Sequence, residues 1–369
     1  MLWRFYRKFM FSNKRGERMN IYTPEGWLNT KHIDEVADRN NINFIVIVGK
    51  RQVGKTYGVL KLMLDEDRRF ILMRRVRPEL DMLCKDVNSP FEKIPCDGLV
   101  KMRKESEYTA AIEKVIESFN DDDESHEEKI RIGTGMTLTG AGNIRGFNGD
   151  IFSDLIFDEF IPEEQVYKVR NEGDAFLNAY VTISGNRELE GRKPLKVWLL
   201  ANSNNLNSRI LEALHITDVV EKMSLRGEES RILKDRGIMV LLPESKTVTE
   251  KRKKTALYKA IGGDSKFSKM AFENEFAYND YTDVMIKPLQ EYNPIITIGR
   301  ITIHLHKNEK TLYVTDKVKY KPRHQFTDSD THINTFNRKF PEVKAAYLRG
   351  KVYFQDMRIK NYFLDIIDN

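Results

Sequence analysis

The stretch "NFIVIVGKRQVGKTYG", residues 43–58, joins a run of apolar residues to a glycine-containing turn. The five apolar residues 44–48 predict a buried strand, and the segment after Gly54 has the pattern of a helix. Between them, residues 49–56 fit the pattern GxxxxGK followed by Ser or Thr. In this pattern the glycines let the chain turn tightly, so that backbone amides point inward beside the positive N-terminus of the helix. The stretch therefore predicts a loop that binds phosphate groups.

The residue types in this loop indicate ATP and Mg²⁺ as the cofactors. Lys55 is expected to reach the β and γ phosphates, and Thr56 is expected to give its hydroxyl to Mg²⁺. The alternative is a glycine-rich turn with an exposed lysine, which the strand-loop-helix setting disfavours. The expected nucleotide-binding residues are Gly49, Lys50, Arg51, Gln52, Val53, Gly54, Lys55, Thr56 and Tyr57.

A pair of adjacent acids follows a second apolar run in "SDLIFDEF", residues 153–160. Asp158 ends this strand in the manner of a Walker B site and is expected to hold the metal together with Thr56. Glu159 is placed to orient and deprotonate an attacking water. The second carboxylate favours water as the acceptor of the phosphoryl group. Alone, such a pair is as a rule a solvated strand end, so the prediction depends on the phosphate loop.

A third apolar run, "KVWLLANSN" at residues 196–204, ends in the amide of Asn202. An amide at this point could sense the γ phosphate or hold the attacking water. The alternative, an asparagine that caps a strand and begins a turn, is equally compatible with the chemistry. The expected catalytic set from these three motifs is Lys55, Glu159 and Asn202.

Length and composition define the class of protein. The chain has 369 residues, 40% of them hydrophobic and 31% charged, which excludes disordered and fibrous classes. Single cores stop growing near about 250–300 residues, so two units are expected. The formal charge of +6 suits a polyanionic partner, although an ordinary basic surface would give the same value. No apolar run approaches the roughly 18–20 residues that cross a bilayer, so no membrane partner is expected.

The order of apolar runs predicts the fold class. Strands at 44–48, 69–73, 154–158 and 196–201 alternate with helical patterns, which indicates an α/β core with a mostly parallel sheet covered on both faces. The last third alternates more openly and predicts antiparallel strands in a smaller α+β domain. The expected division is a basic helical extension at 1–40, a P-loop ATPase core at 41–204, a linker or lid at 205–264 and a C-terminal domain at 265–369.

Seven short segments occur in an order that is similar to a known family. They are "NFIVIVGKRQVGKTYG", "RFILMRRVRPEL", "LIFDEFI", "GNRE", "LLANS", "TEKRKKT" and "FENEF", spread over residues 43–276. The chain resembles the DNA-packaging motor ATPases of tailed phages, and most closely the encapsidation ATPases of φ29-like short-tailed phages. The resemblance implies an ASCE-type ATPase in a homomeric ring, expected to be a pentamer, around double-stranded DNA. It further implies docking on the capsid portal or connector, a packaging RNA or other adaptor, and a place in the host cytoplasm and on the procapsid rather than in the mature virion.

The resemblance also implies an arginine that enters the active site from a neighbouring subunit. Such an arginine would stabilise the transition state only when the ring is correctly arranged. Arg187 in "SGNRE" and Arg145 in "GNIRGF" match the arginine-bearing and basic segments of the family, with Arg192 in reserve. The family often carries a further arginine where this chain has Gly185. A plain surface arginine is the alternative for each position.

Several basic residues are candidates for contacts with DNA. A packaging motor must accept every sequence, so its contacts should go to phosphates rather than to base edges. Pairing with nearby carboxylates or a solvated helix face would explain the same residues. The candidates are Arg74, Arg75, Arg77, Lys251, Arg252, Lys253 and Lys254.

The C-terminal domain is expected, from the resemblance, to be a vestigial RNase H-like domain. Two-metal nucleases hold their ions with several acids, and among the expected strands only Asp316 is acidic, so nuclease activity is not expected. His304 and His306 share one face of an expected strand, and packing or DNA contact is favoured over metal binding.

The leading hypothesis is an ATP-hydrolysing motor that drives double-stranded viral DNA through a portal into a procapsid. Another P-loop translocase or helicase is the first alternative, and strand separation would distinguish it. A nucleotide-binding assembly protein that does not hydrolyse ATP productively is the second.

Overall fold

The computed structural model describes most of the chain in two compact units, Met1–Phe276 and Ala277–Asn369. Each unit has its own sheet and its own core, which is expected for a chain of this length. No helix in the described part of the chain combines the length and apolar character of a bilayer-spanning segment. The described residues are 19–49, 51, 53–119, 125–143, 147–162, 171–202, 208–261 and 283–367.

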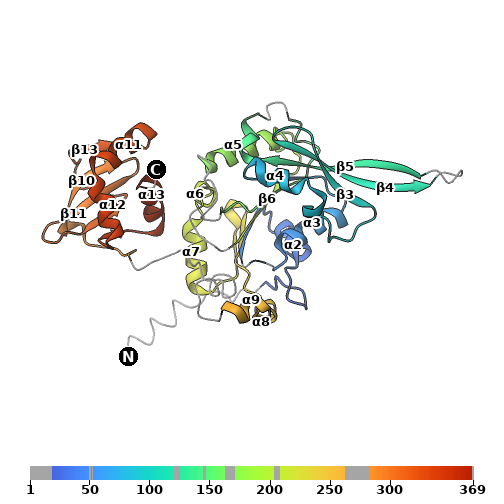
Figure 1. The fold of residues 1–369 in the computed structure, drawn as a ribbon, viewed down its shortest axis with the longest axis horizontal. Coiled ribbons are helices and arrows are strands. Elements are labelled where there is room, and N and C mark those ends of the chain that lie inside the picture. Colours follow the sequence, from blue (N-terminus) through green and yellow to red (C-terminus); the bar gives the residue numbers. More distant parts are fainter. Residues whose placement is uncertain are drawn as a thin grey trace. The chain divides into compact units, whose positions relative to one another are not determined.

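The larger unit is built on a nine-stranded sheet with the order β3-β4-β5-β2-β6-β7-β1-β9-β8 (Figure 1). The neighbours from β5 to β9 in this order are parallel, whereas β3, β4 and β8 pair antiparallel at the two edges. The predicted α/β class is therefore confirmed, with a mixed sheet. The strands are β1 (Phe44–Gly49), β2 (Phe70–Arg74), β3 (Leu99–Lys104), β4 (Thr109–Phe119), β5 (Ser125–Thr137), β6 (Asp154–Asp158), β7 (Lys196–Asn202), β8 (Ser230–Leu233) and β9 (Ile238–Leu241).

Helices cover both faces of this sheet. Val46 and Val48 belong to one apolar cluster and Ile45 and Ile47 to another, because successive side chains of a strand point to opposite faces. The first cluster includes residues of α5, α6 and α7, and the second includes residues of α2, α3 and α4. Burial on both faces explains why β1 reads as an unbroken apolar run. The helices are α2 (Thr30–Arg39), α3 (Lys55–Asp65), α4 (Arg77–Leu83), α5 (Glu172–Ser184), α6 (Arg209–Ala213) and α7 (Thr217–Arg226).

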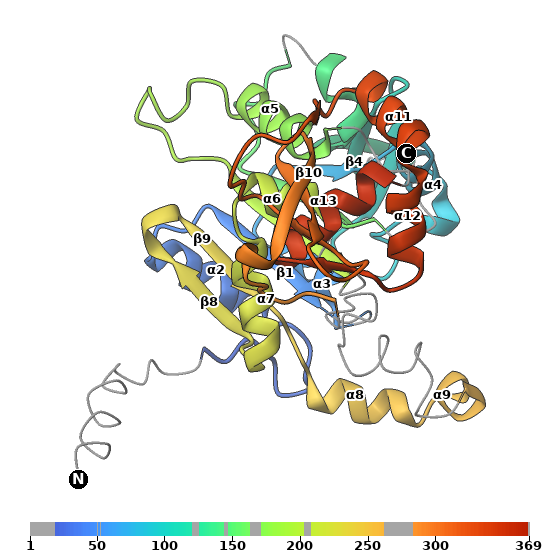
Figure 2. The same cartoon turned by 90° about the vertical axis from the view of Figure 1, so that its left-hand side faces the viewer.

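Part of the expected linker at 205–264 pairs with the large sheet. β9 runs parallel to β1, and β8 pairs antiparallel with β9 at the edge (Figure 2). The apolar residues of β9 are buried, which explains why this segment joins the sheet. Two short helices follow, α8 (Lys246–Lys253) and α9 (Ala256–Ile261). Short 3₁₀ helices occur at η1 (Asp86–Asn88), η2 (Leu138–Asn143), η3 (Lys234–Arg236) and η4 (Leu289–Glu291).

The sequence analysis did not anticipate the hairpin of β4 and β5. These two strands extend as a long pair beyond the body of the sheet (Figure 1). Residues 125–128 of the charged run 121–128 belong to β5, and residues 121–124 lie outside the described residues. Residues 127–131 alternate little in hydropathy and are exposed, so their sequence lacks the apolar pattern of a core strand.

The C-terminal unit contains a five-stranded sheet with the order β13-β10-β11-β12-β14. β10, β11 and β12 pair antiparallel, as expected, and the short edge strands β13 and β14 pair parallel. Apolar residues of α11 and α13, including Phe336 and Phe363, pack on this sheet. The elements are β10 (Tyr292–Ile298), β11 (Ile301–His306), β12 (Leu312–Thr315), β13 (His324–Phe326), β14 (Val352–Phe354), α11 (Asp330–Lys339), α12 (Pro341–Leu348) and α13 (Met357–Ile367).

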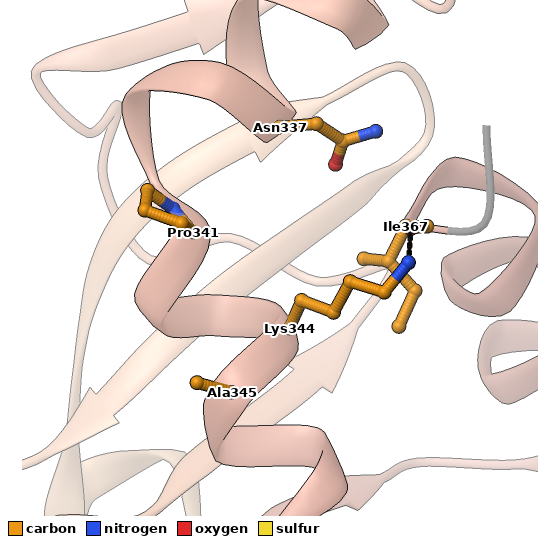
Figure 3. A pocket seen from close by; sticks show the side chains of 5 residues that line it. All are labelled: Asn337, Pro341, Lys344, Ala345 and Ile367. Atoms are coloured by element: carbon orange, nitrogen blue, oxygen red, sulfur yellow. Dashed lines mark hydrogen bonds between the residues drawn. The ribbon is translucent and has the colours of Figure 1, made fainter.

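A cavity of about 300 Å³ lies between these helices, beside the end of α13 (Figure 3). Lys344 donates from Nζ to the carbonyl oxygen of Ile367 at 2.7 Å, and Asn337 donates to the carbonyl of Ile366 at 2.8 Å. The last carbonyls of a helix have no partner within the helix, and these side chains satisfy two of them. The polar side chains of the cavity thus cap the C-terminal carbonyl groups of α13.

Candidate functional site

The sheet order brings the carboxyl ends of four strands together. β2, β6, β7 and β1 are consecutive neighbours and all parallel, so their last residues lie along one edge. Arg74 ends β2, Asp158 ends β6 and Asn202 ends β7, while Gly49 ends β1 directly opposite Asn202. Ligands of open α/β sheets bind outside this edge.

Two glycines shape the loop between β1 and α3. Gly54 precedes α3 with φ of +86°, a conformation that side chains with a Cβ rarely adopt. A Cβ on Gly49 would lie 2.6 Å from Cγ of Pro243, so only glycine fits beside that ring. Val53 is buried, whereas Arg51 and Tyr57 are exposed. The predicted residues Lys50 and Gln52 lie outside the described residues.

Lys55 begins α3 and is buried at the strand ends. Its Nζ donates to the carbonyl oxygen of Gly49 at 3.0 Å and to Oδ1 of Asn202 at 3.2 Å. The first amides of α3 have no partner within the helix and carry the positive end of the helix dipole. The amine, the amide of Asn202 and the helix terminus thus form one group at this edge.

Thr56 and Asp158 are also in direct contact. The Thr56 hydroxyl donates to Oδ1 of Asp158 at 2.8 Å. Burial raises the pKa of the Asp158 carboxyl above its ordinary value, while the positive charge of Arg74 acts in the opposite direction. A hydroxyl and a carboxylate in contact are oxygen donors of the kind that Mg²⁺ prefers.

Glu159 has an unusual backbone conformation immediately after β6. Its φ is +56°, and left-handed backbone of this kind is disfavoured by about 1–2 kcal/mol for residues other than glycine. Phe160 then donates its amide to the carbonyl oxygen of Leu200 on β7, which fixes the turn. The Glu159 side chain is 53% exposed and extends toward the strand ends, where its Oε2 pairs with Arg74. Local strain of this kind is common at functional sites.

Arg74 and Arg75 are not placed for contacts with DNA, contrary to the prediction. Both are buried, at 8% and 1% exposure. Arg74 pairs with Asp158 and Glu159 at 2.8 and 2.7 Å, and Nε of Arg75 pairs with Oε1 of Glu172 at 2.6 Å. Arg74 ends and Arg75 follows an apolar strand that lies inside the sheet, so their charges meet carboxylates of the same chain.

The remaining DNA candidates are nearer to the surface. Arg77 is exposed and pairs with Asp81 and Glu107 on the same unit. Lys251 on α8 and Lys254 directly after it are exposed, and Lys253 pairs with Glu250 at 2.8 Å. The structure does not describe the side chain of Arg252. A solvated helix face, the alternative stated above, accounts for these positions on α8.

Arg187 is buried inside its own subunit, which contradicts a role as an arginine presented to a neighbour. Its guanidinium donates to three backbone carbonyl oxygens: Ser184 at 3.1 Å, Phe152 at 2.9 Å and Gly149 at 2.8 Å. Burial lowers the pKa of this guanidinium. A turn after α5 brings the side chain back over the segment before β6, which explains the burial.

The other two arginine candidates differ from Arg187. Arg192 is exposed and pairs with Asp150 at 3.1 Å and Glu190 at 2.7 Å. Arg145 lies outside the described residues.

The sequence analysis missed a turn that supports the loop of residues 49–56. Leu28 donates its amide to the carbonyl oxygen of Val53 at 3.1 Å, and the ring of Trp27 lies against Gly54. Ser245, which follows β9, donates its hydroxyl to the carbonyl oxygen of Gly26 at 2.7 Å. The last contact joins segments 219 residues apart, and neither segment carries a motif that could have revealed it.

The two histidines of β11 have separate environments. His304 is fully buried, and burial lowers the pKa of its imidazole, so the ring is neutral at physiological pH. His306 accepts the amides of Asn308 and Glu309 at Nδ1, at 3.2 and 2.9 Å. In the described parts of the chain, no three His, Cys, Asp or Glu side chains are grouped so that they could hold a metal ion.

Comparisons with known proteins identify the fold. No family model and no curated protein sequence matches the chain. Among solved structures, a chain of "The Phi-28 gp11 DNA packaging Motor" has a TM-score of 0.57 and 15% identity, over 94% of this chain and 99% of that one. A chain of "The bacteriophage Phi-29 viral genome packaging motor assembly" has a TM-score of 0.58 and 16% identity, over 90% of this chain and 97% of that one. At this level of identity the likeness establishes a common fold with these two chains.

Proposed function

We propose that this protein is the ATP-hydrolysing subunit of a viral motor that packages double-stranded DNA. The observation that carries the proposal is the group of Lys55, Thr56, Asp158, Glu159 and Asn202 at one edge of the sheet. This group contains the parts that ATP hydrolysis requires: a cation for the phosphates, oxygen donors for Mg²⁺ and a carboxylate for water. The fold that the chain has in common with parts of packaging motors supports the biological setting.

Each residue of the group has a proposed task. Lys55 and the amides that begin α3 hold the β and γ phosphates of ATP, and Thr56 with Asp158 holds Mg²⁺. When bound, Mg²⁺ neutralises charge on the phosphates during transfer. Glu159 orients a water and accepts its proton, while Asn202 responds to the γ phosphate or positions the same water. Arg145 and Arg192 are the candidates for the arginine that a neighbouring subunit supplies.

The proposed partners follow from the packaging setting. The chain would form a homomeric ring on the portal of a procapsid, with a packaging RNA or another adaptor, in the host cytoplasm. Double-stranded DNA would pass through the ring and meet basic side chains at its phosphates, with Arg77 and the lysines of α8 as candidates. Because such contacts release counterions, DNA binding should weaken steeply with salt and tolerate any sequence.

Replacing Lys55 with alanine tests the proposal most directly. The variant loses the cation at the phosphates, and we expect at least about a 100-fold loss of ATP turnover and no packaging of duplex DNA into empty procapsids. Phosphate release and nuclease-protected DNA measure the two effects. The matched control is Lys61→Ala on the same helix, whose amine pairs with Asp65 at an exposed position. Equal turnover in the two variants would refute the proposed ATP site.

Two other functions predict different results. A helicase would separate the strands of a duplex, and an assembly protein would bind ATP with the same low turnover before and after Glu159→Gln. No described contact favours either function, whereas the acid pair after β6 favours hydrolysis.

A further inference from the structure

Trp27 is an exposed tryptophan beside the loop of residues 49–56. It is 44% exposed, whereas Trp198 on β7 is fully buried and donates from Nε1 to Oδ1 of Asp154 at 3.0 Å. Tryptophan carries a large apolar surface that folding as a rule removes from water. Single exposed apolar side chains are also found on ordinary surfaces, so the surroundings of Trp27 decide whether it has a function.

The backbone that carries the indole is fixed by hydrogen bonds. Thr23 donates its amide to the carbonyl oxygen of Trp27 at 2.8 Å, and Trp27 donates its amide to Oγ1 of Thr23 at 3.3 Å. The next residue, Leu28, donates its amide to the carbonyl oxygen of Val53 at 3.1 Å. The contact with the segment after β9, described above, holds the other side of this turn. A ligand that binds the indole therefore does not have to order the backbone first, which lowers the cost of binding.

The indole lies against the glycine that precedes α3. Two atoms of Trp27 are 3.8 and 3.9 Å from the position that a Cβ on Gly54 would take. Tyr57 is three residues further along, on the same side of the helix, and is 43% exposed. One turn beyond Gly54, Thr30 donates its hydroxyl to the carbonyl oxygen of Gly58 at 2.8 Å. Two exposed aromatic residues thus flank the first turn of α3, whose amides are proposed to hold the phosphates.

The two ends of a nucleoside triphosphate need different surroundings. The γ phosphate needs charges and hydrogen bonds, which the side chains at the strand ends offer. The ribose and base are joined to the α phosphate at the other end, and the base has a flat face that stacks favourably on aromatic rings. A purine offers a larger face than a pyrimidine, and inorganic tripolyphosphate offers none.

We propose that Trp27 is the residue on which the base of the bound nucleotide stacks, and that it favours purine nucleoside triphosphates over pyrimidine ones and over free polyphosphate. The inference rests on the proposed function, in which the loop of residues 49–56 holds the phosphates. The base lies away from the reacting phosphate, so stacking stabilises the ground state and the transition state equally. Trp27 therefore determines the affinity for the nucleotide rather than the rate of the chemical step.

The test compares ATP with inorganic tripolyphosphate, each with Mg²⁺, in the full-length wild type and in Trp27→Ala. Titration calorimetry should show that the substitution raises the Kd of ATP by about 5- to 50-fold and that of tripolyphosphate by less than about 2-fold. The KM for ATP should rise while kcat stays within about 2-fold of wild type. CTP should lose less affinity than ATP. An equal loss for ATP and tripolyphosphate, or an unchanged Kd for ATP, would overturn the inference.

Trp27→Phe separates stacking from support of the loop, because it keeps an aromatic face. Its Kd for ATP should stay within about 3-fold of wild type. In the wild type, ATP should protect the indole fluorescence from quenching by acrylamide, and this protection should disappear in Trp27→Phe. The control is Tyr320→Ala, at an aromatic residue of the C-terminal unit that is 56% exposed, and it should leave Kd and KM unchanged.

The fluorescence measurement decides the outcome if Trp27→Ala lowers the Tm by more than about 10 °C or if tripolyphosphate binds too weakly to measure. Full access of acrylamide to the wild-type indole at saturating ATP would reject the inference. A Trp27→Ala variant that binds ATP like wild type but no longer self-associates would also reject it, and would place Trp27 at a contact between subunits.

Failure of the proposed function gives a different pattern. If wild-type protein turns over ATP no faster than Lys55→Ala while ATP still protects Trp27 from acrylamide, the ATPase proposal fails and the inference about the base stands. If wild type is active, Lys55→Ala is inactive and Trp27→Ala binds ATP with the wild-type Kd, only the inference about Trp27 fails.

Discussion

Glu159→Gln is expected to lower the rate of ATP hydrolysis by about 100- to 10,000-fold and to leave ATP binding intact. Glutamine has the size of glutamate but cannot accept a proton from water. It keeps an oxygen toward Arg74, so the turn after β6 and the buried contact between Thr56 and Asp158 should persist. Phosphate release under single-turnover conditions measures the chemical step, and binding of a fluorescent ATP analogue measures affinity.

The control for this prediction is Glu92→Gln, an exposed position away from the strand ends. It should retain full turnover. Wild-type hydrolysis in Glu159→Gln would contradict the assignment of Glu159 as the base and would favour an assembly protein. Loss of ATP binding would instead indicate that Glu159 acts on the fold of the loop.

Arg187→Ala is expected to destabilise the larger unit by about 3 kcal/mol or more. The change removes the guanidinium donor from three carbonyl oxygens, those of Gly149, Phe152 and Ser184, of which the first and the last still accept a backbone amide. Each unsatisfied buried group costs roughly 1–3 kcal/mol, with partial relief if water enters. For a unit of this size the Tm should fall by about 6–12 °C. Thermal and urea unfolding of the purified variant measure the change.

Arg192→Ala is the control for this second prediction. Its guanidinium is exposed and pairs at the surface, so its loss should change stability by less than about 1 kcal/mol. Mixed rings of wild-type and Arg187→Ala subunits complete the test. If the variant is as stable as wild type and a wild-type neighbour restores its ATPase activity, Arg187 acts between subunits and the structural assignment is wrong.

Residue patterns were sufficient to predict the central strands of the large sheet. The central residues of β1, β6 and β7 form unbroken apolar runs because both faces of these strands are covered, and that pattern differs from the alternation of a half-exposed strand. β5 lacks such a pattern because its residues 127–131 are exposed, and β8 and β9 follow a polar region that has the composition of a linker. Local patterns therefore predicted the strands of the core better than those at the edges.

The roles of three arginines could not be predicted from residue patterns. Arg74, Arg75 and Arg187 look alike in the sequence, as cations near apolar runs. Each one meets partners that are 35 to 97 residues away along the chain, and those partners decide its role. Sequence spacing carries no information about such pairs when no alignment of related chains constrains them.

By itself, the sequence determined that a buried strand, a glycine-bounded loop and a helix follow one another at residues 44–65, and that acids and an amide end two further strands. These features depend on neighbours along the chain, whose sterics and hydropathy are local. Only the tertiary structure decided that β2, β6, β7 and β1 are adjacent, so that Arg74 meets Glu159 and Lys55 meets Asn202. The physical reason is that strand order follows from the packing of whole helices against the sheet, a property of distant residues together.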